Sequence, residues 1–390
     1  MKNKPSNNII AGAAALLLGT AAYAQNDDEI TDLQNQINAL QQQLQGLRNN
    51  NDNPDWLANA QSESLKFNFY GSMKWKSAEN GSDTLDPHRW VLIPSYRLSE
   101  NAIFLTELEL EHGGTDSDGA SGSRFDGYLE LEQMYIDVTI NEHMTWRSLG
   151  ISLIPVGTIN ENHEPDQFYS VYRPRLYKYI IPSTWMEAST GLFGDVPGVD
   201  GLSYTFLLSS GLTSDHVTES TSAWNIRSLR PGVNVSGNDY AYTARLGYDR
   251  GGFSGSISTY QTTYSAQSGA ESDMGLYDIE ASYMFNNGLE LIADYAWWDL
   301  ETPDNIVSGL GYDELAGYRL EAAYHIDHGE TNKIIPFIRL EEYDYKGSKK
   351  EYLTWGAMYK FGDHWEIKAS YFDDRDGDND EIQFGIGVQF

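Results

Sequence analysis

The sequence predicts an all-β fold, a transmembrane antiparallel β-barrel of about sixteen strands preceded by a short α-helical coiled coil. Three observations support this prediction. Apolar and polar residues alternate along many segments after residue 64, short turns alternate with long acidic loops, and a heptad stripe precedes them. Aromatic residues make up 13% of the chain, which favours β-structure. The mean hydropathy of -0.49 agrees with a barrel, because only alternate residues of its strands face lipid.

The first 24 residues have the features of a secretory signal peptide. Lys2 and Lys4 form a basic start, residues 9–18 are apolar, and Ala22-Tyr23-Ala24 fits the small-x-small cleavage rule. The alternative is a membrane anchor, but the apolar run is shorter than the ~20 residues that a spanning helix needs. We therefore expect a signal peptide over residues 1–24.

Residues 25–53 predict a coiled coil and linker. Apolar residues recur there at spacings of three and four, namely Ile30, Leu33, Ile37, Leu40, Leu44 and Leu47. This narrow stripe in a Gln-rich background favours a coil between chains over a single helix packed on its own domain, and it leaves dimer or trimer open. Because such a short coil is marginal alone, the following domain must supply most of the association.

Residues 54–390 are expected to form the barrel. The last segment shows the period of two most clearly, with apolar residues at Ile382, Phe384, Ile386, Val388 and Phe390. The residues between them are small or polar, which is typical of a strand with one face toward lipid and the other toward a lumen. Similar alternation occurs over residues 65–76, 241–248, 315–326, 351–361 and 364–373. A soluble β-sandwich could show the same alternation.

The connections favour the barrel over the sandwich. Short turns are expected near residues 99–101, 141–143, 250–252, 286–288 and 362–363. Long acidic, Gly/Ser-rich stretches lie at 78–87, 113–127, 211–239, 263–274 and 300–312. Tight periplasmic turns that alternate with long outer loops are characteristic of outer-membrane barrels. This order places both the N- and C-termini on the periplasmic side.

Composition excludes several classes of function. The net charge of -31 argues against nucleic-acid binding, and the absence of cysteine excludes disulfides and thiolate metal sites. The histidines show no metal-ligand spacing, and no phosphate-binding loop or nucleophile elbow is present, so we expect no metal, no cofactor and no enzymatic activity. Two alternatives remain open: a closed barrel acting as an anchor or adhesin, and a barrel enzyme of the phospholipase type.

A specific motif set lies in the middle of the chain. It comprises Leu-Ile-Pro-Val-Gly at 153–157, Asn-Glu-Asn-His-Glu-Pro at 160–165 and Ile-Ile-Pro-Ser-Thr-Trp at 180–185, with acidic segments upstream at 107–112 and 131–135. Together these segments resemble the phosphate-selective porin O/P family. The resemblance implies a trimeric sixteen-stranded barrel whose third loop folds inward to narrow the pore. The N-terminal coil is similar to that of dicarboxylate-type porins.

Carried over by position, the resemblance makes residues 157–187 the constriction loop. Arg173, Arg175 and Lys178 cluster in it, and a ring of cations at a narrow point selects for anions. The alternative is that these cations pair with acidic residues and only hold the loop. The expected partners within the loop are Glu161, His163, Glu164 and Glu187. Three further arginines could continue the path along the wall, namely Arg245, Arg319 and Arg339.

The sequence thus predicts an outer-membrane porin of a Gram-negative bacterium, which lets small hydrophilic solutes diffuse passively. The loop cations favour small anions such as phosphate or carboxylates, whereas the acidic remainder of the chain would favour cations, and the sequence leaves this choice open. The expected partners are two further copies of the chain in a homotrimer, outer-membrane lipids and lipopolysaccharide, and the small solutes themselves.

Overall fold

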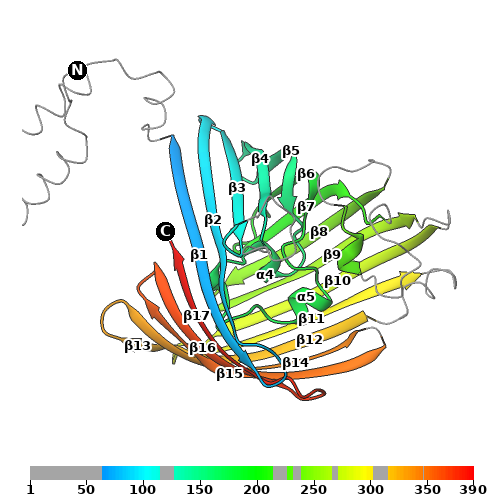
Figure 1. The fold of residues 1–390 in the computed structure, drawn as a ribbon. Helices are drawn as coiled ribbons and strands as arrows, with labels where there is room; N and C mark the ends of the chain where they lie inside the picture. The colour runs from blue at the N-terminus through cyan, green and yellow to red at the C-terminus, as the bar shows by residue number, and fades with distance from the viewer. Residues whose placement is uncertain are drawn as a thin grey trace, which may run out of the picture. The chain divides into compact units, whose positions relative to one another are not determined.

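The computed structural model describes residues 64–114, 127–213, 226–231, 239–265, 271–301, 315–345 and 347–390. The predicted signal peptide and coiled coil lie outside these residues. The described residues form one antiparallel sheet with four short helical segments (Figure 1). Among the described residues, no helix reaches the length and apolar character that crossing a membrane requires.

The strands follow one another around the barrel in chain order. Their bounds are β1 (Leu65–Ala78), β2 (Thr84–Ser99), β3 (Ala102–Glu111), β4 (Leu129–Asn141), β5 (Met144–Leu153), β6 (Met186–Asp195), β7 (Leu202–Ser210), β8 (Tyr240–Arg250), β9 (Phe253–Ser265), β10 (Glu271–Met284), β11 (Leu289–Glu301), β12 (Leu315–Tyr324), β13 (Ile326–His328), β14 (Asn332–Tyr345), β15 (Ser348–Phe361), β16 (Trp365–Asp374) and β17 (Glu381–Gln389). The helical segments are α4 (Thr158–Glu161), η1 (Pro165–Gln167), α5 (Leu176–Tyr179) and η2 (Ile226–Leu229).

The sheet closes on itself. The first strand, β1, pairs with the last, β17, through partners such as Met73 and Ile386. β12 and β13 both pair with β14 and are two pieces of one wall strand interrupted at His325, so the wall has sixteen strands. Closure pairs the strand edges that an open sheet would leave exposed. The predicted antiparallel barrel of sixteen strands is therefore confirmed.

The two faces of the wall differ as the alternation predicts. Ile382 and Ile386 on β17 are about half exposed, whereas Gln383 between them is buried. On β1, Met73 is exposed and its neighbour Lys74 is buried. An apolar outer face and a polar inner face are what a barrel surrounded by lipid requires.

The predicted short turns occur where two strands meet. The Asn286–Gly288 turn joins β10 to β11, and Gly288 adopts φ 88°, a left-handed conformation that glycine accepts without strain. The turn at 250–252 joins β8 to β9, and the one at 362–363 joins β15 to β16. Longer connections lie at the opposite ends of β8, β9, β10 and β11, whereas β14 and β15 are joined by only residues 346–347.

The connection between β5 and β6 folds into the barrel. Residues 154–185 include α4, η1 and α5, and Figure 1 shows α4 and α5 surrounded by the strands. Two glycines of β17 make room for this segment: a Cβ atom at Gly387 would lie only 2.5 Å from the Cβ of Pro165, and one at Gly385 3.1 Å from Val171 Cγ1. The small residues on the inner face of the last strand therefore allow close approach of the segment.

The main buried apolar cluster lies between the inner segment and the wall. Trp185 at the end of the segment packs against Tyr260 of β9, with ring centroids 4.5 Å apart, and also against Trp298 of β11. Each of these large aromatic side chains removes much apolar surface from water. The interior of the barrel therefore contains a packed core beside the segment.

Candidate functional site

Wall side chains fix the inner segment at several points. The ammonium group of Lys368 on β16 donates to the carbonyls of Pro165, Phe168 and Ser170. On β14, Glu341 Oε1 accepts a hydrogen bond of 2.9 Å from the N–H of Leu176. These buried, charge-assisted bonds come from two strands and hold the segment in one position.

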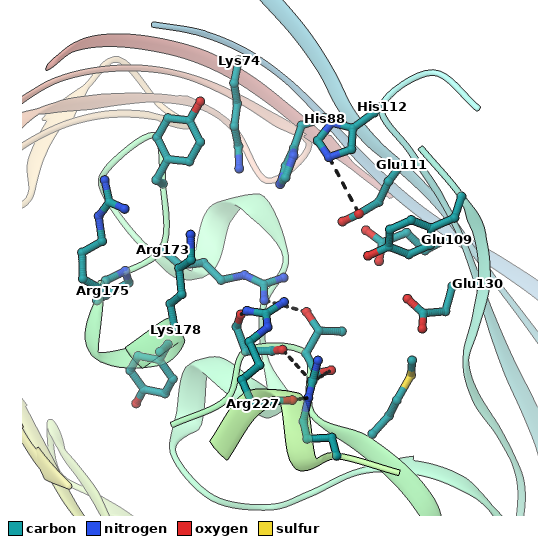
Figure 2. Close-up of a pocket in the computed structure, with 18 of the residues that line it drawn as sticks. Lys74, His88, Glu109, Glu111, His112, Glu130, Arg173, Arg175, Lys178 and Arg227 are labelled. Carbon is teal, nitrogen blue, oxygen red and sulfur yellow. Dashed lines mark hydrogen bonds and ion pairs between the residues drawn. The ribbon is translucent and has the colours of Figure 1, made fainter. Parts of the chain in front are cut away.

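A pocket of about 580 Å³ lies beside the inner segment. Its cationic lining residues are Lys74, Arg173, Arg175, Lys178, Arg227 and Arg230. Its acidic lining residues are Glu109, Glu111 and Glu130. Figure 2 shows most of the cations on one side of the pocket and the glutamates on the other. The charges of the site are therefore segregated, which sets up an electric field across the space between them.

The three predicted loop cations come together in this pocket. Arg173 Nη1 donates to Thr184 Oγ1 at 2.7 Å, and the guanidinium of Arg175 lies 4.5 Å from the ring centre of Phe372. Lys178 is exposed. Burial, together with nearby Arg89, lowers the pKa of Arg173 to about 10. The guanidinium groups of Arg173 and Arg175 are therefore cationic at neutral pH.

Two further arginines of the pocket were not predicted. Arg227 and Arg230 belong to the short η2 segment and its end, and Arg227 Nη1 donates to Ser183 Oγ at 2.7 Å. Arg230 Nη1 donates to the carbonyls of Ser183 and Thr184 at 3.1 and 3.0 Å. Burial and the neighbouring Arg227 lower the pKa of Arg230 to about 10. The available signal was that these are the two basic residues of an otherwise acidic stretch over 211–239.

The carboxylates of the inner segment are engaged elsewhere. Glu161 forms an ion pair with Arg245 on β8. Asp166 forms an ion pair of 3.0 Å with Lys360 on β15. Glu187 accepts hydrogen bonds from Trp185 Nε1 at 2.9 Å and from a serine of β7. Burial raises the pKa of Glu164. Among the residues that the structure describes, no carboxylate lies within 4.0 Å of the charged groups of Arg173, Arg175 or Lys178.

The predicted wall arginines do not line the pocket. Arg319 Nε lies 2.6 Å from Asp294 Oδ2, and Arg339 Nε lies 3.0 Å from Glu341 Oε2. Arg339 also donates to Ser170 Oγ, and Arg245 donates to Thr158 Oγ1 as well as pairing with Glu161. These three side chains contact the inner segment or neighbouring carboxylates, so the structure separates them from the loop cations.

His163 lies in a buried cluster with Glu107 and Glu132. Its Nδ1 is 3.1 Å from the carbonyl of Asn160, and its Nε2 is 3.0 Å from the hydroxyl of Tyr70 and 3.5 Å from Glu132. Burial, with Arg173 and Arg89 nearby, lowers the pKa of His163 to about 3. The imidazole is therefore neutral and joins the inner segment to β1 and β4.

The acidic side of the pocket was also missed as a site. Glu109 and Glu111 alternate along β3, so both face inward, and Glu130 comes from the adjacent strand β4. The segment at 107–112 was interpreted only as part of a family motif. The alternation itself was the signal, because a strand with glutamate at every second position turns all of them to one face.

Comparisons with known proteins agree with the architecture. No family model matches the chain. An uncharacterized protein of Aquifex aeolicus (strain VF5) is 27% identical over 324 residues, which are 74% of this chain and 70% of that protein. Among solved structures, Salmonella typhi OmpF in complex with daunomycin is similar with a TM-score of 0.59 and 15% identity, covering 84% of this chain and 97% of that one. The chain has the porin fold.

Two more porins show the same likeness. The anion-selective porin of Comamonas acidovorans matches with a TM-score of 0.56 and 13% identity, covering 84% of this chain and 99% of that one. OprB of Pseudomonas putida matches with a TM-score of 0.53 and 10% identity, covering 86% of this chain and 96% of that one. At these identities the likeness concerns the fold. The finer resemblance to the phosphate-selective O/P family stays a prediction.

Proposed function

We propose that the protein is an outer-membrane porin that admits small hydrophilic solutes and prefers small anions. The observation that supports this preference is the group of loop cations at the pocket, which have no carboxylate partner among the described residues. Lys178 and Arg227 are exposed there and face the open space. The residues 157–187 then act as the constriction loop.

The cations at the neck have a stronger effect on a permeating ion than the acidic residues of the distant outer loops. At physiological salt the Debye length is ~8 Å, so the field of acidic outer loops is screened before it reaches the neck. Inside a narrow neck two charges 4 Å apart interact by ~4 kcal/mol at an effective dielectric of 20, against ~1 kcal/mol in bulk water. A few cations at the neck can therefore decide selectivity in a chain with a formal charge of -31.

Phosphate and carboxylates are the proposed solutes. A guanidinium group binds either through two parallel hydrogen bonds, and the pocket offers several guanidinium groups from two segments of the chain. A neighbour in the structural comparison is described as anion-selective, which is in line with this choice.

We further propose that the protein assembles as a trimer in the outer membrane. The chain is exported by its signal peptide, forms a homotrimer with help from the coil at 25–53, and places both ends of the barrel on the periplasmic side. Its outward apolar residues contact outer-membrane lipids, and its long loops contact lipopolysaccharide. Trimeric porins are among the solved structures that it resembles.

Reversal potentials in a salt gradient test the anion preference. We expect the wild-type channel to favour anions and the double variant Lys178→Glu/Arg227→Glu to lose that preference. Each reversal changes the side-chain charge by two units, and even a change of about 1 kcal/mol in the energy of a passing ion corresponds to about a fivefold change in the permeability ratio. Both side chains are exposed, so the barrel should fold normally.

The matched control is Arg250→Glu, which reverses an exposed charge next to a turn and outside the pocket. We expect this control to leave the reversal potential unchanged. A cation-selective wild type, or equal effects of the control and the double variant, would contradict the proposal. Single-channel conductance also separates a porin from an anchor or a barrel enzyme, since a closed barrel passes no ions.

A further inference from the structure

A second cluster of side chains lies at the edge of the pocket. Asp86 and His88 belong to β2, and His112 directly follows β3. The N–H of His112 donates to the carbonyl of His88 at 3.1 Å, which places the two imidazoles side by side with ring centroids 5.7 Å apart. His88 and His112 both line the pocket, as Figure 2 shows.

The potential ligand atoms of these three residues converge. His112 Nδ1 lies 2.7 Å from Asp86 Oδ1, and His88 Nδ1 lies 3.4 Å from Asp86 Oδ2. All the ligand atoms lie within 4.8 Å of one another. A tetrahedral zinc ion with bonds of about 2.0–2.1 Å needs ligands about 3.3 Å apart, so small side-chain rotations are enough to form a site.

We propose that Asp86, His88 and His112 bind a divalent transition-metal ion at the edge of the pocket. Two imidazoles and one carboxylate suit Zn²⁺, Ni²⁺ or Cu²⁺. Calcium and magnesium are poor candidates, because they prefer an all-oxygen shell of six or more ligands. The remaining coordination positions face the pocket, where water or a passing anion can occupy them.

An unsatisfied polar atom supports the site independently. The Nδ1 atom of His88 is buried and has no hydrogen-bond partner among the described residues, although it points toward Asp86. Leaving a buried polar atom unpaired is unfavourable, and a bound metal ion would remove that penalty. Glu111 Oε2 lies 3.9 Å from Nε2 of His112, where a carboxylate can orient a ligating imidazole.

One nearby group opposes a bound cation. Lys74 lines the same pocket, and its ammonium group lies 4.7 Å from the ring centre of Tyr172 on the inner segment. The carboxylates of Asp86 and Glu111 offset this charge on the side of the histidines. The balance gives a direct test, because Lys74→Met should tighten metal binding.

Direct binding tests the proposal without any measurement of transport. The full folded chain in detergent is stripped with a chelator and titrated with Zn²⁺ by calorimetry and with Co²⁺ by visible absorption. We expect one tight site per chain. His88→Ala and His112→Ala should each weaken binding by about 10- to 100-fold or more, and Asp86→Asn should weaken it in the same direction. Excess Ca²⁺ should not compete.

Two further variants make the assignment specific. His143→Ala removes a histidine whose side chain is 42% exposed next to a turn, and this variant should bind as the wild type does. His163→Ala removes a ligand from the other cluster of potential metal ligands, formed by Glu107, Glu132 and His163, and should also leave tight binding intact. Heat-modifiable migration on gels shows which variants have folded barrels.

Tight binding that survives in His88→Ala/His112→Ala, or that disappears in folded His163→Ala, would overturn the site. A further readout rests on the proposed function: Zn²⁺ on the acidic side of the pocket should shift the reversal potential further toward anions. If the channel proves not to favour anions while the binding data hold, only the proposed function fails.

Discussion

The barrel contains two groups of inward-facing cations that differ in their partners. On the wall, Arg319 and Arg339 are buried beside carboxylates of their own or neighbouring strands. On the inner segment, Arg173, Arg175 and Lys178 line an open pocket and have no carboxylate partner among the described residues. Both groups lie inside the same barrel and consist mainly of arginines.

The difference shows which cations can act on a solute. A buried charge must be paired to be tolerated, and its field is then largely cancelled by its partner. A cation beside open space keeps its field and can attract an anion. Position inside the barrel is therefore not enough, and we expect the wall arginines to affect stability while the pocket cations affect selectivity.

Arg319→Met should give the largest effect on stability. Arg319 is 2% exposed and contacts Asp294, Glu321 and Glu280. Its loss leaves buried carboxylates unpaired, at a cost of about 3–5 kcal/mol in the free energy of unfolding. Guanidinium-induced unfolding of the folded barrel in detergent or lipid measures this change.

The matched control for stability is Arg250→Met. Arg250 is 61% exposed and pairs with Asp200 at 3.6 Å, so its loss should cost about 0–1 kcal/mol. Lys178→Met should likewise leave stability unchanged while weakening the anion preference. If Arg319→Met unfolds at the same denaturant concentration as the control, the division between paired and unpaired cations is wrong.

Neutralising the acidic side of the pocket should change the permeability ratio less than the loss of the loop cations does. The change should have the opposite sign, so that the anion preference increases. Glu111→Gln/Glu130→Gln removes two negative charges that line the pocket opposite the loop cations. We expect the permeability ratio to rise by about twofold in favour of anions, because screening limits each charge. Reversal potentials are recorded with a chelator present, so that no metal ion bound near Glu111 contributes.

Glu142→Gln is the control for this experiment, since Glu142 lies in a turn and is largely exposed. It should behave as the wild type. A shift toward cations in the double variant would show that these glutamates stabilise the position of the loop cations instead of competing with them.

The barrel could be predicted because its signal is local. In a strand such as the one at 382–390, alternate residues face lipid and lumen, so its own sequence shows both faces without any information about the neighbouring strands. The signal weakens where strands are irregular. The pairing of β3 with β4 shifts register between Glu107 and Leu108, and the pairing of β4 with β5 shifts between Met134 and Asp137. A register shift changes which residues face inward, so periodicity alone misleads there.

The site was harder to predict because it depends on register between strands. Arg319 lies directly opposite Asp294, and Arg339 directly opposite Glu321, in the strand pairing. The sequence showed that these arginines face inward but not which carboxylates oppose them. The same holds for His88 and His112, which are 24 positions apart and meet only because Arg89 pairs with Glu111. The cluster of Arg173, Arg175 and Lys178 was found because its members are neighbours in the chain.

The smallest predicted effect distinguishes lysine from arginine within the unpaired group. Partial desolvation inside the pocket lowers the pKa of Lys178, and Arg175, Arg227 and Lys76 nearby lower it further. The side chain should therefore lose its charge at a lower pH than an ordinary lysine, whose pKa is about 10.4. As pH rises from neutrality toward that value, the anion preference of the wild type should decline. The decline should be smaller than in the double charge-reversal variant, because only one charge is lost.

Lys178→Arg should keep its anion preference over the same pH range, since guanidinium stays protonated. Arg227→Gln should move the decline to higher pH, because it removes one of the cations that lower the pKa. Reversal potentials recorded from pH 7 upward measure all three, and a wild type that matches Lys178→Arg throughout would show that Lys178 does not act on the permeating ion.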